Sequence, residues 1–464
     1  MAARLIESRS HIVPGKLKIT ELFFDVPLNY SSSSSSETIR LFGRSVTKHE
    51  PTIAALSDEE LRKKSQKPWF VYLQGGPGFG CSAPQSMAVT NLVLEQGYQM
   101  LYLDQRGTGL SSTITAATLA TKGDSHQQAD YLKAFRADSI VQDCEAVRKN
   151  LTADYPPELK KWSIFGQSFG GFCAVTYLSQ FPQGLREVFT SGGIPPVGKS
   201  PEEVYKATFA QVIKRNQAYY QKFPDDIEAV HDLAIYIKSQ NGLSLPGGGT
   251  LTVRRFLMLG LLLGGHGGVD TLHGIIMRMR SDLSQFTFFT RPTLSIVESL
   301  VGFDDNIIYA ILHESIYCEG RASDWAAYRV GQSLAEYHWM SSTPSSPATV
   351  RQNPLHFSGE MIYPFTFETY PELAKLKDVA QLIADYDSWP VLYDEWQLAR
   401  NEVPVYAATF VDDMYVDFRL VQETVAKIKN CKQFITNTMY HDAIRSKPEE
   451  VVKALFALRN DNID

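Results

Sequence analysis

The sequence predicts an α/β protein with a mostly parallel central sheet and a large helical insertion. Short apolar segments alternate with helical segments up to about residue 198, and strand patterns return at residue 403. These segments are apolar almost throughout, which is typical of strands buried on both faces of a parallel sheet. The chain between them is rich in helical patterns and aromatic residues. We therefore predict a core formed by residues 1–198 and 386–464, with a helical cap over residues 199–385.

The composition is that of an ordinary globular protein without a strong charge bias. Of the 464 residues, 44% are hydrophobic and 21% are charged, which is typical of soluble domains. The formal net charge of −6 predicts no basic surface for nucleic acid or for an anionic membrane. The expected partner is a small molecule or a peptide, and the composition leaves the oligomeric state open.

The cysteines and the apolar runs favour a cytoplasmic location. The five cysteines are widely spaced and form no C-x-x-C pair, as expected in a reducing compartment. Residues 1–10 contain no apolar run of the kind found in signal peptides. The most apolar stretch, residues 256–263, has less than half of the ~20 residues that span a bilayer. We predict that it forms a buried helix.

The order of the predicted elements follows from apolar periodicity and from turn residues. Residues 16–30 and 38–46 are expected to form an antiparallel pair, joined by an exposed loop that contains the serine run 31–36. Residues 49–67 are mostly polar and are expected to be a surface connection. Core strands are predicted at 69–73, 100–104, 162–166, 185–191, 403–411 and 433–436, and core helices at 137–151, 171–181, 418–430 and 448–458.

The segment Gly166-Gln-Ser168-Phe-Gly170 matches the pattern G-x-S-x-G between a predicted strand and a predicted helix. In that context the serine lies on a strained bend that exposes its hydroxyl, and the flanking small residues prevent backbone collisions. The pattern alone also fits an ordinary glycine-rich turn. The flanking strand and helix favour the first interpretation, so we predict that Ser168 is the nucleophile of an α/β-hydrolase fold.

A serine nucleophile needs a base and an acid that orients the base. His441 follows the predicted strand 433–436 and is the only histidine after His356, so it is the predicted base. In this fold the acid precedes the histidine and follows a strand. Asp412 and Asp413 both satisfy that condition; we choose Asp413 and keep Asp412 as the alternative. Two other aspartates are expected elsewhere, in a helix cap or facing solvent (Asp417) and as a local loop charge (Asp442).

Acyl transfer also needs two backbone N–H groups directed at the developing oxyanion. One is expected from Phe169, which follows the nucleophile, and the other from Gly76 in the glycine loop after the first core strand. A phosphate-binding loop is the competing interpretation. The sequence contains neither G-x-x-x-x-G-K-[ST] nor G-x-G-x-x-G, which argues against that interpretation.

These motifs together resemble those of the proline iminopeptidase (prolyl aminopeptidase) family of α/β-hydrolases, in its larger, fungal-type branch. The matching segments, in the family's order, are Gly75-Gly-Pro-Gly78, Asp104-Gln-Arg-Gly-Thr-Gly-Leu-Ser111, Gly166-Gln-Ser-Phe-Gly-Gly171, Asp413-Met and His441. Three positions depart from the usual pattern: Gln74 replaces a histidine, Gln167 precedes the nucleophile, and Phe169 stands where many relatives have tryptophan. These departures leave the substrate preference open.

The resemblance implies a serine aminopeptidase that releases an N-terminal residue, preferably proline, from a small peptide or amino-acid amide. It implies no cofactor and no metal. Glu314 and Glu360 match cap segments of the family that bind the substrate's amine, although solvated helix carboxylates are the alternative. Three cap aromatics are expected either to line a site for the proline ring or to belong to the core: Tyr317, Trp325 and Trp339.

Two other functions remain open from the sequence alone. The same three catalytic residues would serve an esterase, a lactonase or an amide hydrolase of secondary metabolism. A non-catalytic binding protein of this fold is the other possibility, and an intact set of Ser168, Asp413 and His441 argues against it.

Overall fold

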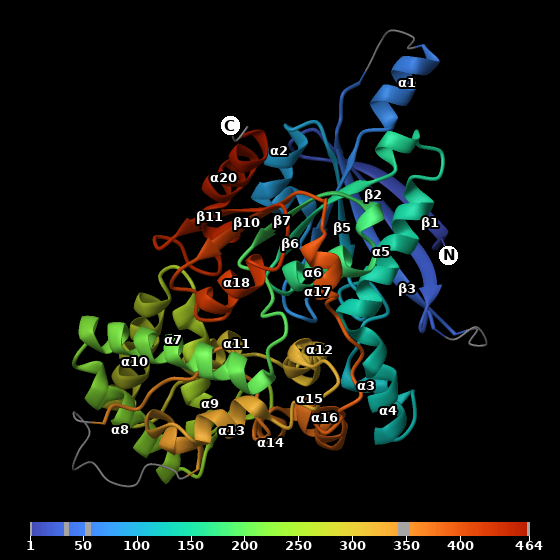
Figure 1. Ribbon diagram of the computed structural model, residues 1–464. Coiled ribbons are helices and arrows are strands. Elements are labelled where there is room, and N and C mark those ends of the chain that lie inside the picture. Colours follow the sequence, from blue (N-terminus) through green and yellow to red (C-terminus); the bar gives the residue numbers. More distant parts are fainter. Residues whose placement is uncertain (1, 32–36, 52–56, 342–352, 462–464) are drawn as a thin grey trace.

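The computed structural model describes residues 2–31, 37–51, 57–341 and 353–461. Most of the predicted serine loop and of a Ser/Pro-rich stretch near residue 345 lies outside these ranges. The described chain contains a nine-stranded sheet in the order β1-β2-β3-β5-β4-β6-β7-β10-β11 (Figure 1). From β5 to β11 all neighbouring strands are parallel. The predicted fold class, a mostly parallel α/β sheet with a helical insertion, is confirmed.

The parallel strands are short and apolar, as the sequence predicts. Almost all of their residues are buried except in the edge strand β11. Their bounds are β4 Trp69–Leu73, β5 Gln99–Asp104, β6 Trp162–Gln167, β7 Leu185–Ser191, β10 Val405–Phe410 and β11 Cys431–Thr436.

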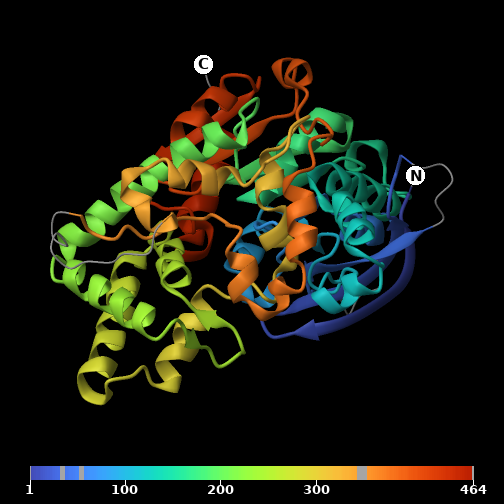
Figure 2. The ribbon, with the colours of Figure 1, turned by 90° about the horizontal axis from the view of Figure 1, so that it is seen from below.

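Three antiparallel strands from the N-terminal part of the chain extend the sheet beyond β5. The predicted pair corresponds to β2 (Leu17–Pro27) and β3 (Thr38–Lys48), and β3 pairs with β5. The edge strand β1 (Arg4–Val13), which pairs with β2, was not predicted from the sequence. Figure 2 shows this edge in dark blue, away from the helical insertion. Because β1 is largely exposed, its sequence lacks the apolar alternation that identifies a half-buried strand.

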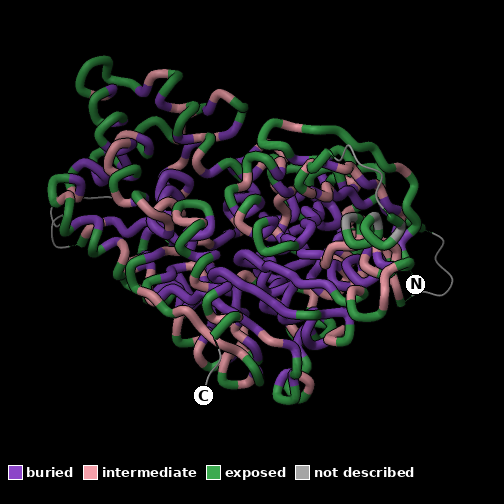
Figure 3. The backbone as a smooth tube through the Cα atoms, turned by 90° about the horizontal axis from the view of Figure 1, so that it is seen from above, coloured by how far each residue is buried: buried purple, intermediate pink, exposed green. Residues whose placement is uncertain are grey.

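Helices cover both faces of the sheet. Along β4, Val71 packs into the cluster that includes α5 and α6, whereas Phe70 and Tyr72 pack into the cluster that includes α2 and α20. Figure 3 shows the resulting buried centre in purple. The core helices are α2 Ala88–Leu94, α5 Ala137–Leu151, α6 Phe169–Gln180, α18 Phe418–Val425, α19 Ala443–Ser446 and α20 Pro448–Asn460. Three shorter helices precede α5: α1 Asp58–Ser65, α3 Ala116–Ala120 and α4 Ser125–Leu132.

Between β7 and β10 the regular elements of the described chain are helices, apart from one two-stranded hairpin, β8 (Leu243–Ser244) and β9 (Thr250–Leu251). The helices of residues 199–385 gather below the sheet in Figure 1. The apolar stretch 256–263 lies within α9 and a following 3-10 helix, Met258–Gly264, and is largely buried. The insertion contains α7 Pro201–Lys222, α8 Asp226–Ser239, α9 Val253–Leu257, α10 Gly268–Phe286, α11 Arg291–Leu300, α12 Ile307–Leu312, α13 Ala326–Gln332, α14 Thr366–Thr369, α15 Pro371–Ala374 and α16 Lys377–Ala384, and α17 Glu395–Ala399 follows it.

Within the described ranges, every helix is too short or too polar to cross a membrane. The carboxyl ends of β4, β6, β7, β10 and β11 lie at one edge of the sheet because these strands are parallel. In open α/β sheets this edge is where ligands bind. The segments that follow those strands contain every core residue that the sequence predicts for catalysis.

Candidate active site

Ser168 lies between β6 and α6 in a backbone conformation that side chains rarely adopt. Its φ is 53° and its ψ is −125°, so this bend carries the strain that is typical of a functional turn. The Ser168 amide donates to the carbonyl of Ser191, and the Gly171 amide donates to the carbonyl of Ser168. Both hydrogen bonds hold the bend in place.

The two glycines of the G-x-S-x-G segment leave no space for a side chain. A Cβ atom at Gly166 would lie 2.4 Å from the carbonyl oxygen of Gly170. A Cβ atom at Gly170 would lie 2.0 Å from the carbonyl oxygen of Leu73 in the neighbouring strand. Contacts this close to backbone atoms cannot be relieved by a side-chain rotation. The bend at Ser168 therefore requires glycine on both sides.

Three predicted residues from three segments form one hydrogen-bonded chain. The Nε2 atom of His441 is 2.8 Å from the Oγ atom of Ser168, and its Nδ1 atom is 2.7 Å from Oδ2 of Asp413. The other oxygen of Asp413, Oδ1, accepts the amides of Tyr415 and Val416 at 2.8 and 3.0 Å. Ser168, His441 and Asp413 are all buried. This arrangement has the geometry in which an imidazole can accept a proton from a serine hydroxyl.

The electrostatic environment favours the protonated form of His441. Burial, the largest single influence, would by itself lower the pKa of this imidazole, but the charge and hydrogen bond of Asp413, together with the charge of Glu360, outweigh burial and raise it. The charge of Arg445 acts in the opposite direction and lowers the pKa of His441. A proton on this ring is therefore stabilised by its surroundings.

The other aspartates have different surroundings. Asp412 is exposed, whereas Asp413 is hydrogen-bonded to His441. Asp417 is buried and accepts the amides of Arg419 and Leu420, so it caps α18. Asp442 was expected to be a local loop charge. Instead, it accepts hydrogen bonds from the amide and the ring of His266 in the helical insertion.

The predicted oxyanion donors lie on the two segments beside the nucleophile. Phe169 is the first residue of α6, so its amide has no acceptor within the helix. Gly76 has a φ of 138°, in the region that favours glycine. The preceding glycine places this loop against the nucleophile, because a Cβ atom at Gly75 would lie 3.0 Å from the Cβ atom of Ser168.

The Asp104-Gln-Arg-Gly-Thr-Gly segment supports the glycine loop from behind. Asp104 accepts the amides of Cys81 and Leu110 at 2.7 and 2.9 Å. Arg106 is completely buried and makes two hydrogen bonds to Asp143. A buried arginine is tolerated when its donors are satisfied in this way. This segment therefore has a structural role, since Asp104 fixes the chain at Cys81 and Leu110 and Arg106 is paired with Asp143.

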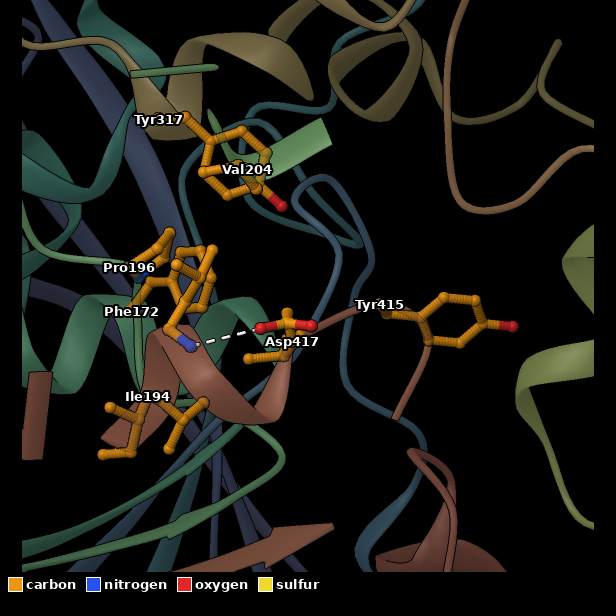
Figure 4. A pocket seen from close by; sticks show the side chains of 10 residues that line it. Phe172, Ile194, Pro196, Val204, Tyr317, Tyr415 and Asp417 are labelled. Atoms are coloured by element: carbon orange, nitrogen blue, oxygen red, sulfur yellow. Dashed lines mark hydrogen bonds between the residues drawn. The ribbon is translucent and has the colours of Figure 1, made fainter. Parts of the chain in front are cut away.

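A small, mostly apolar pocket lies beside the nucleophile helix where core and insertion meet. Phe172 of α6 and Ile194 contribute from the core, and Val204 and Tyr317 contribute from the insertion (Figure 4). The carboxylate of Asp417, which accepts the Leu420 amide, also lines this pocket. Tyr317, one of the three aromatic residues considered for the proline-ring site, thus lines a pocket next to α6.

The other two aromatic residues named above belong to the packing of the insertion. Trp339 is buried and donates from its indole N–H to the carbonyl of His356 at 2.9 Å. Trp325 donates to Gln381 and packs edge-on against Phe367. Neither residue lines the pocket described above.

The two cap glutamates are held differently. Glu314 is buried and accepts the amides of Ala326 and Ala327 at 3.2 and 2.9 Å. Burial raises the pKa of Glu314 to about 7, although these hydrogen bonds oppose the shift. Glu360 accepts a hydrogen bond from the hydroxyl of Tyr309 at 3.0 Å.

The electrostatic interactions of Glu360 place it near the predicted catalytic residues. Burial raises its pKa, and the charges of both His441 and Asp413 act on it. Tyr317 interacts electrostatically with both glutamates and with Asp413. Burial raises the pKa of Tyr317, and so do the charges of Glu360, Asp413 and Glu314. Tyr317 is therefore within electrostatic reach of three carboxylates from the core and the insertion.

Sequence reasoning missed one residue that contacts the histidine. The ring of Tyr415 packs edge-on against the His441 ring, with centroids 4.7 Å apart, and its hydroxyl donates to the carbonyl of Leu261. Its position two residues after Asp413, on the same loop, was the signal that could have identified it. Tyr415 connects the histidine to the helical insertion.

The chain is similar to known proteins over its whole length. A family model described as the alpha/beta hydrolase fold matches residues 68–270. Together with the strand order, this match defines the protein as an α/β-hydrolase. A proline iminopeptidase from Aspergillus aculeatus is 46% identical over 462 residues, which cover 100% of this chain and 98% of that protein.

Two further relatives have the same name. One from Aeromonas sobria is 39% identical over 456 residues, covering 98% of this chain and 100% of that protein. Another from Lactobacillus helveticus is 26% identical over 145 residues, covering 31% of this chain and 42% of that protein. On the basis of the two full-length matches, the chain belongs to the proline iminopeptidase family. The family predicted from the sequence motifs is confirmed.

Proposed function

We propose that this protein is a serine aminopeptidase that releases an N-terminal residue, preferably proline, from small peptides or amino-acid amides. The observation that carries this proposal is the hydrogen-bonded chain from Ser168 through His441 to Asp413. The full-length similarity to two proline iminopeptidases supports the substrate class. An esterase would use the same chain of residues, so the amine-binding groups decide between the two.

The reaction proceeds by acylation and deacylation. His441 removes the proton from the Ser168 hydroxyl as the Oγ atom attacks the carbonyl carbon of the first peptide bond. The amides of Phe169 and Gly76 stabilise the negative oxygen that forms. His441 then delivers its proton to the leaving amine, and the C–N bond breaks. A water molecule, activated by the same imidazole, hydrolyses the resulting ester and restores the serine.

Recognition of the free amine is assigned to Glu360 and Glu314. A buried carboxylate is costly unless it is paired, and an ammonium or secondary amine of the substrate would provide the partner. Glu360 is the stronger candidate because its charge interacts with both His441 and Asp413. The oxygens of Glu314 already accept two backbone amides, so Glu314 is assigned the second position.

The proposal also assigns catalysis and amine binding to two different parts of the chain. Residues 1–198 and 386–464 form the core that supplies Ser168, Asp413 and His441. Residues 199–385 form the cap that supplies Glu314 and Glu360. All five cysteines are free, which fits the proposed cytoplasmic location.

Four chromogenic substrates test the proposal: the p-nitroanilides of proline and alanine, each with a free or an acetylated amine. We expect hydrolysis only with a free amine, and faster hydrolysis of the proline compound. Equal rates on acetylated substrates would instead identify a general amide hydrolase or esterase. Failure of a fluorophosphonate to label Ser168, together with no turnover, would identify a non-catalytic binding protein.

Replacing Glu360 by glutamine is expected to reduce kcat/KM on proline p-nitroanilide by about 10- to 100-fold, because a charge-assisted hydrogen bond to the amine is lost. Hydrolysis of p-nitrophenyl acetate, which has no amine, should change by less than about threefold. Glu314→Gln should show the same selectivity with a smaller effect. The exposed Glu368 of the insertion provides the control, since Glu368→Gln should leave both rates unchanged. Equal losses on both substrates would mean that Glu360 has no part in amine recognition.

A further inference from the structure

The helical insertion binds the residues on both sides of His441. On one side, the ring of His266 donates from Nδ1 to Oδ1 of Asp442 at 2.6 Å, and the His266 amide donates to the same oxygen at 3.0 Å. The hydroxyl of Ser446 lies 2.8 Å from the same ring nitrogen. Both His266 and Asp442 are only partly exposed. Two hydrogen bonds to one carboxylate oxygen thus connect the insertion to the residue after the predicted base.

The residue before His441 is held by the same part of the insertion. The guanidinium of Arg215 lies over the ring of Tyr440, 4.4 Å from its centroid, within the range of a cation–π contact. The His266 ring packs edge-on against Tyr440 with centroids 5.1 Å apart. Arg215 is itself fixed by a hydrogen bond from its Nε atom to the carbonyl of Leu263 at 2.9 Å.

We propose that His266 is a positioning residue for the catalytic histidine: by holding Asp442 and Tyr440, it sets the backbone position from which the His441 ring reaches Ser168. This inference rests on the proposed function, because it assigns His441 the role of base. Asp413 orients the ring of His441, whereas His266 fixes the loop that carries it. A nucleophile and its base react efficiently only in a narrow range of geometries, and displacements of about 1 Å can cost about 100-fold in rate.

His266→Ala tests this role because it removes the ring hydrogen bond and keeps the backbone amide. We expect kcat on proline p-nitroanilide to fall by about 10- to 100-fold, with KM within about twofold because the amine-binding glutamates are untouched. His266→Asn should restore most of the rate, since its side-chain amide can donate to Asp442. The exposed His126 supplies the matched control, and His126→Ala should behave like the wild type.

A double-mutant cycle shows whether His266 acts through Asp442. If it does, Asp442→Ala should reduce kcat by a similar factor, and the two substitutions together should cost no more than the larger single effect. Multiplicative losses, an unchanged kcat in His266→Ala, or a loss that His266→Asn does not restore would overturn the proposal. Thermal unfolding of each variant separates these effects from a loss of folded protein.

A measurement without substrate keeps this inference distinguishable from the proposed function. We expect the proton between His441 Nδ1 and Asp413 to give a low-field proton NMR signal, and the disappearance of this signal in His441→Gln would assign it. His266→Ala should shift or broaden this signal, and His266→Asn should return it to the wild-type position. If the wild type fails to hydrolyse proline p-nitroanilide while the signal responds in this way, the aminopeptidase function is wrong and the positioning role stands. An unperturbed signal in His266→Ala overturns the positioning role.

Discussion

Replacing Ser168 by alanine is expected to reduce kcat on proline p-nitroanilide by about 10⁶-fold, the loss typical when a serine nucleophile is removed. The Oγ atom of Ser168 is the group 2.8 Å from Nε2 of His441, and alanine offers no atom that can be acylated. The residual rate would come from binding and oxyanion stabilisation alone. The measurement is steady-state hydrolysis at substrate saturation.

The same substitution should leave the fold intact. Ser168 has a positive φ, a conformation that alanine disfavours as much as serine does, so the strain of the bend is unchanged. We expect the free energy of unfolding to change by less than about 1 kcal/mol. Ser179, a buried serine near the other end of α6, provides a matched control, and Ser179→Ala should retain wild-type turnover. Substantial activity in Ser168→Ala would exclude the proposed acyl-enzyme.

Replacing Asp413 by asparagine is expected to reduce kcat by about 10⁴-fold. Oδ1 of Asp413 accepts two backbone amides, so the oxygen of asparagine would keep that position and its NH₂ group would face His441. An NH₂ group there can only donate to Nδ1, which places the ring proton on Nε2. In that tautomer His441 cannot accept the proton of Ser168. The fold should tolerate the change because the two amide contacts remain.

The neighbouring aspartate provides an internal control for this prediction. Asp412 is exposed, and Asp412→Asn should leave kcat within about twofold of the wild type because exposed substitutions away from the site have small effects. The pH profile adds a second measurement. Because Asp413 raises the pKa of His441, the acid limb of kcat/KM should move to lower pH in Asp413→Asn. A large loss in Asp412→Asn with little loss in Asp413→Asn would reverse the assignment.

The buried elements were the most predictable from the sequence. Helix α5 spans Ala137–Leu151, the range that its apolar periodicity predicts. Exposed elements were missed because burial is what creates such periodicity. Strand β1 is largely exposed, and helix α1 lies in a segment that was interpreted as a polar connection. A capping signal was present for α1, since Ser57 and Glu60 form a capping box, which is a recognisable sequence pattern.

The candidate site shows a different limit. Chain order alone could not separate Asp412 from Asp413, since both follow β10. What distinguishes the two residues is which side chain points toward His441. The hydrogen bonds from the amides of Tyr415 and Val416 hold the Asp413 side chain in that direction. The contact between His266 and Asp442 joins residues 176 positions apart, and no local pattern encodes it. Contacts of this kind arise only when the insertion packs on the core.

Three contacts join the helical insertion to the loops of the core that carry the candidate active site. The glycine loop contacts α12, since a Cβ atom at Gly78 would lie 2.7 Å from the amide nitrogen of Tyr309. The Tyr415 hydroxyl donates a hydrogen bond to the carbonyl of Leu261. Asp442 accepts a hydrogen bond from His266. The insertion is therefore not an interchangeable module. A chimaera that joins this core to the helices of a distant relative would lose partners of the glycine loop and of the histidine loop together, so changing specificity by exchanging whole insertions would also impair turnover.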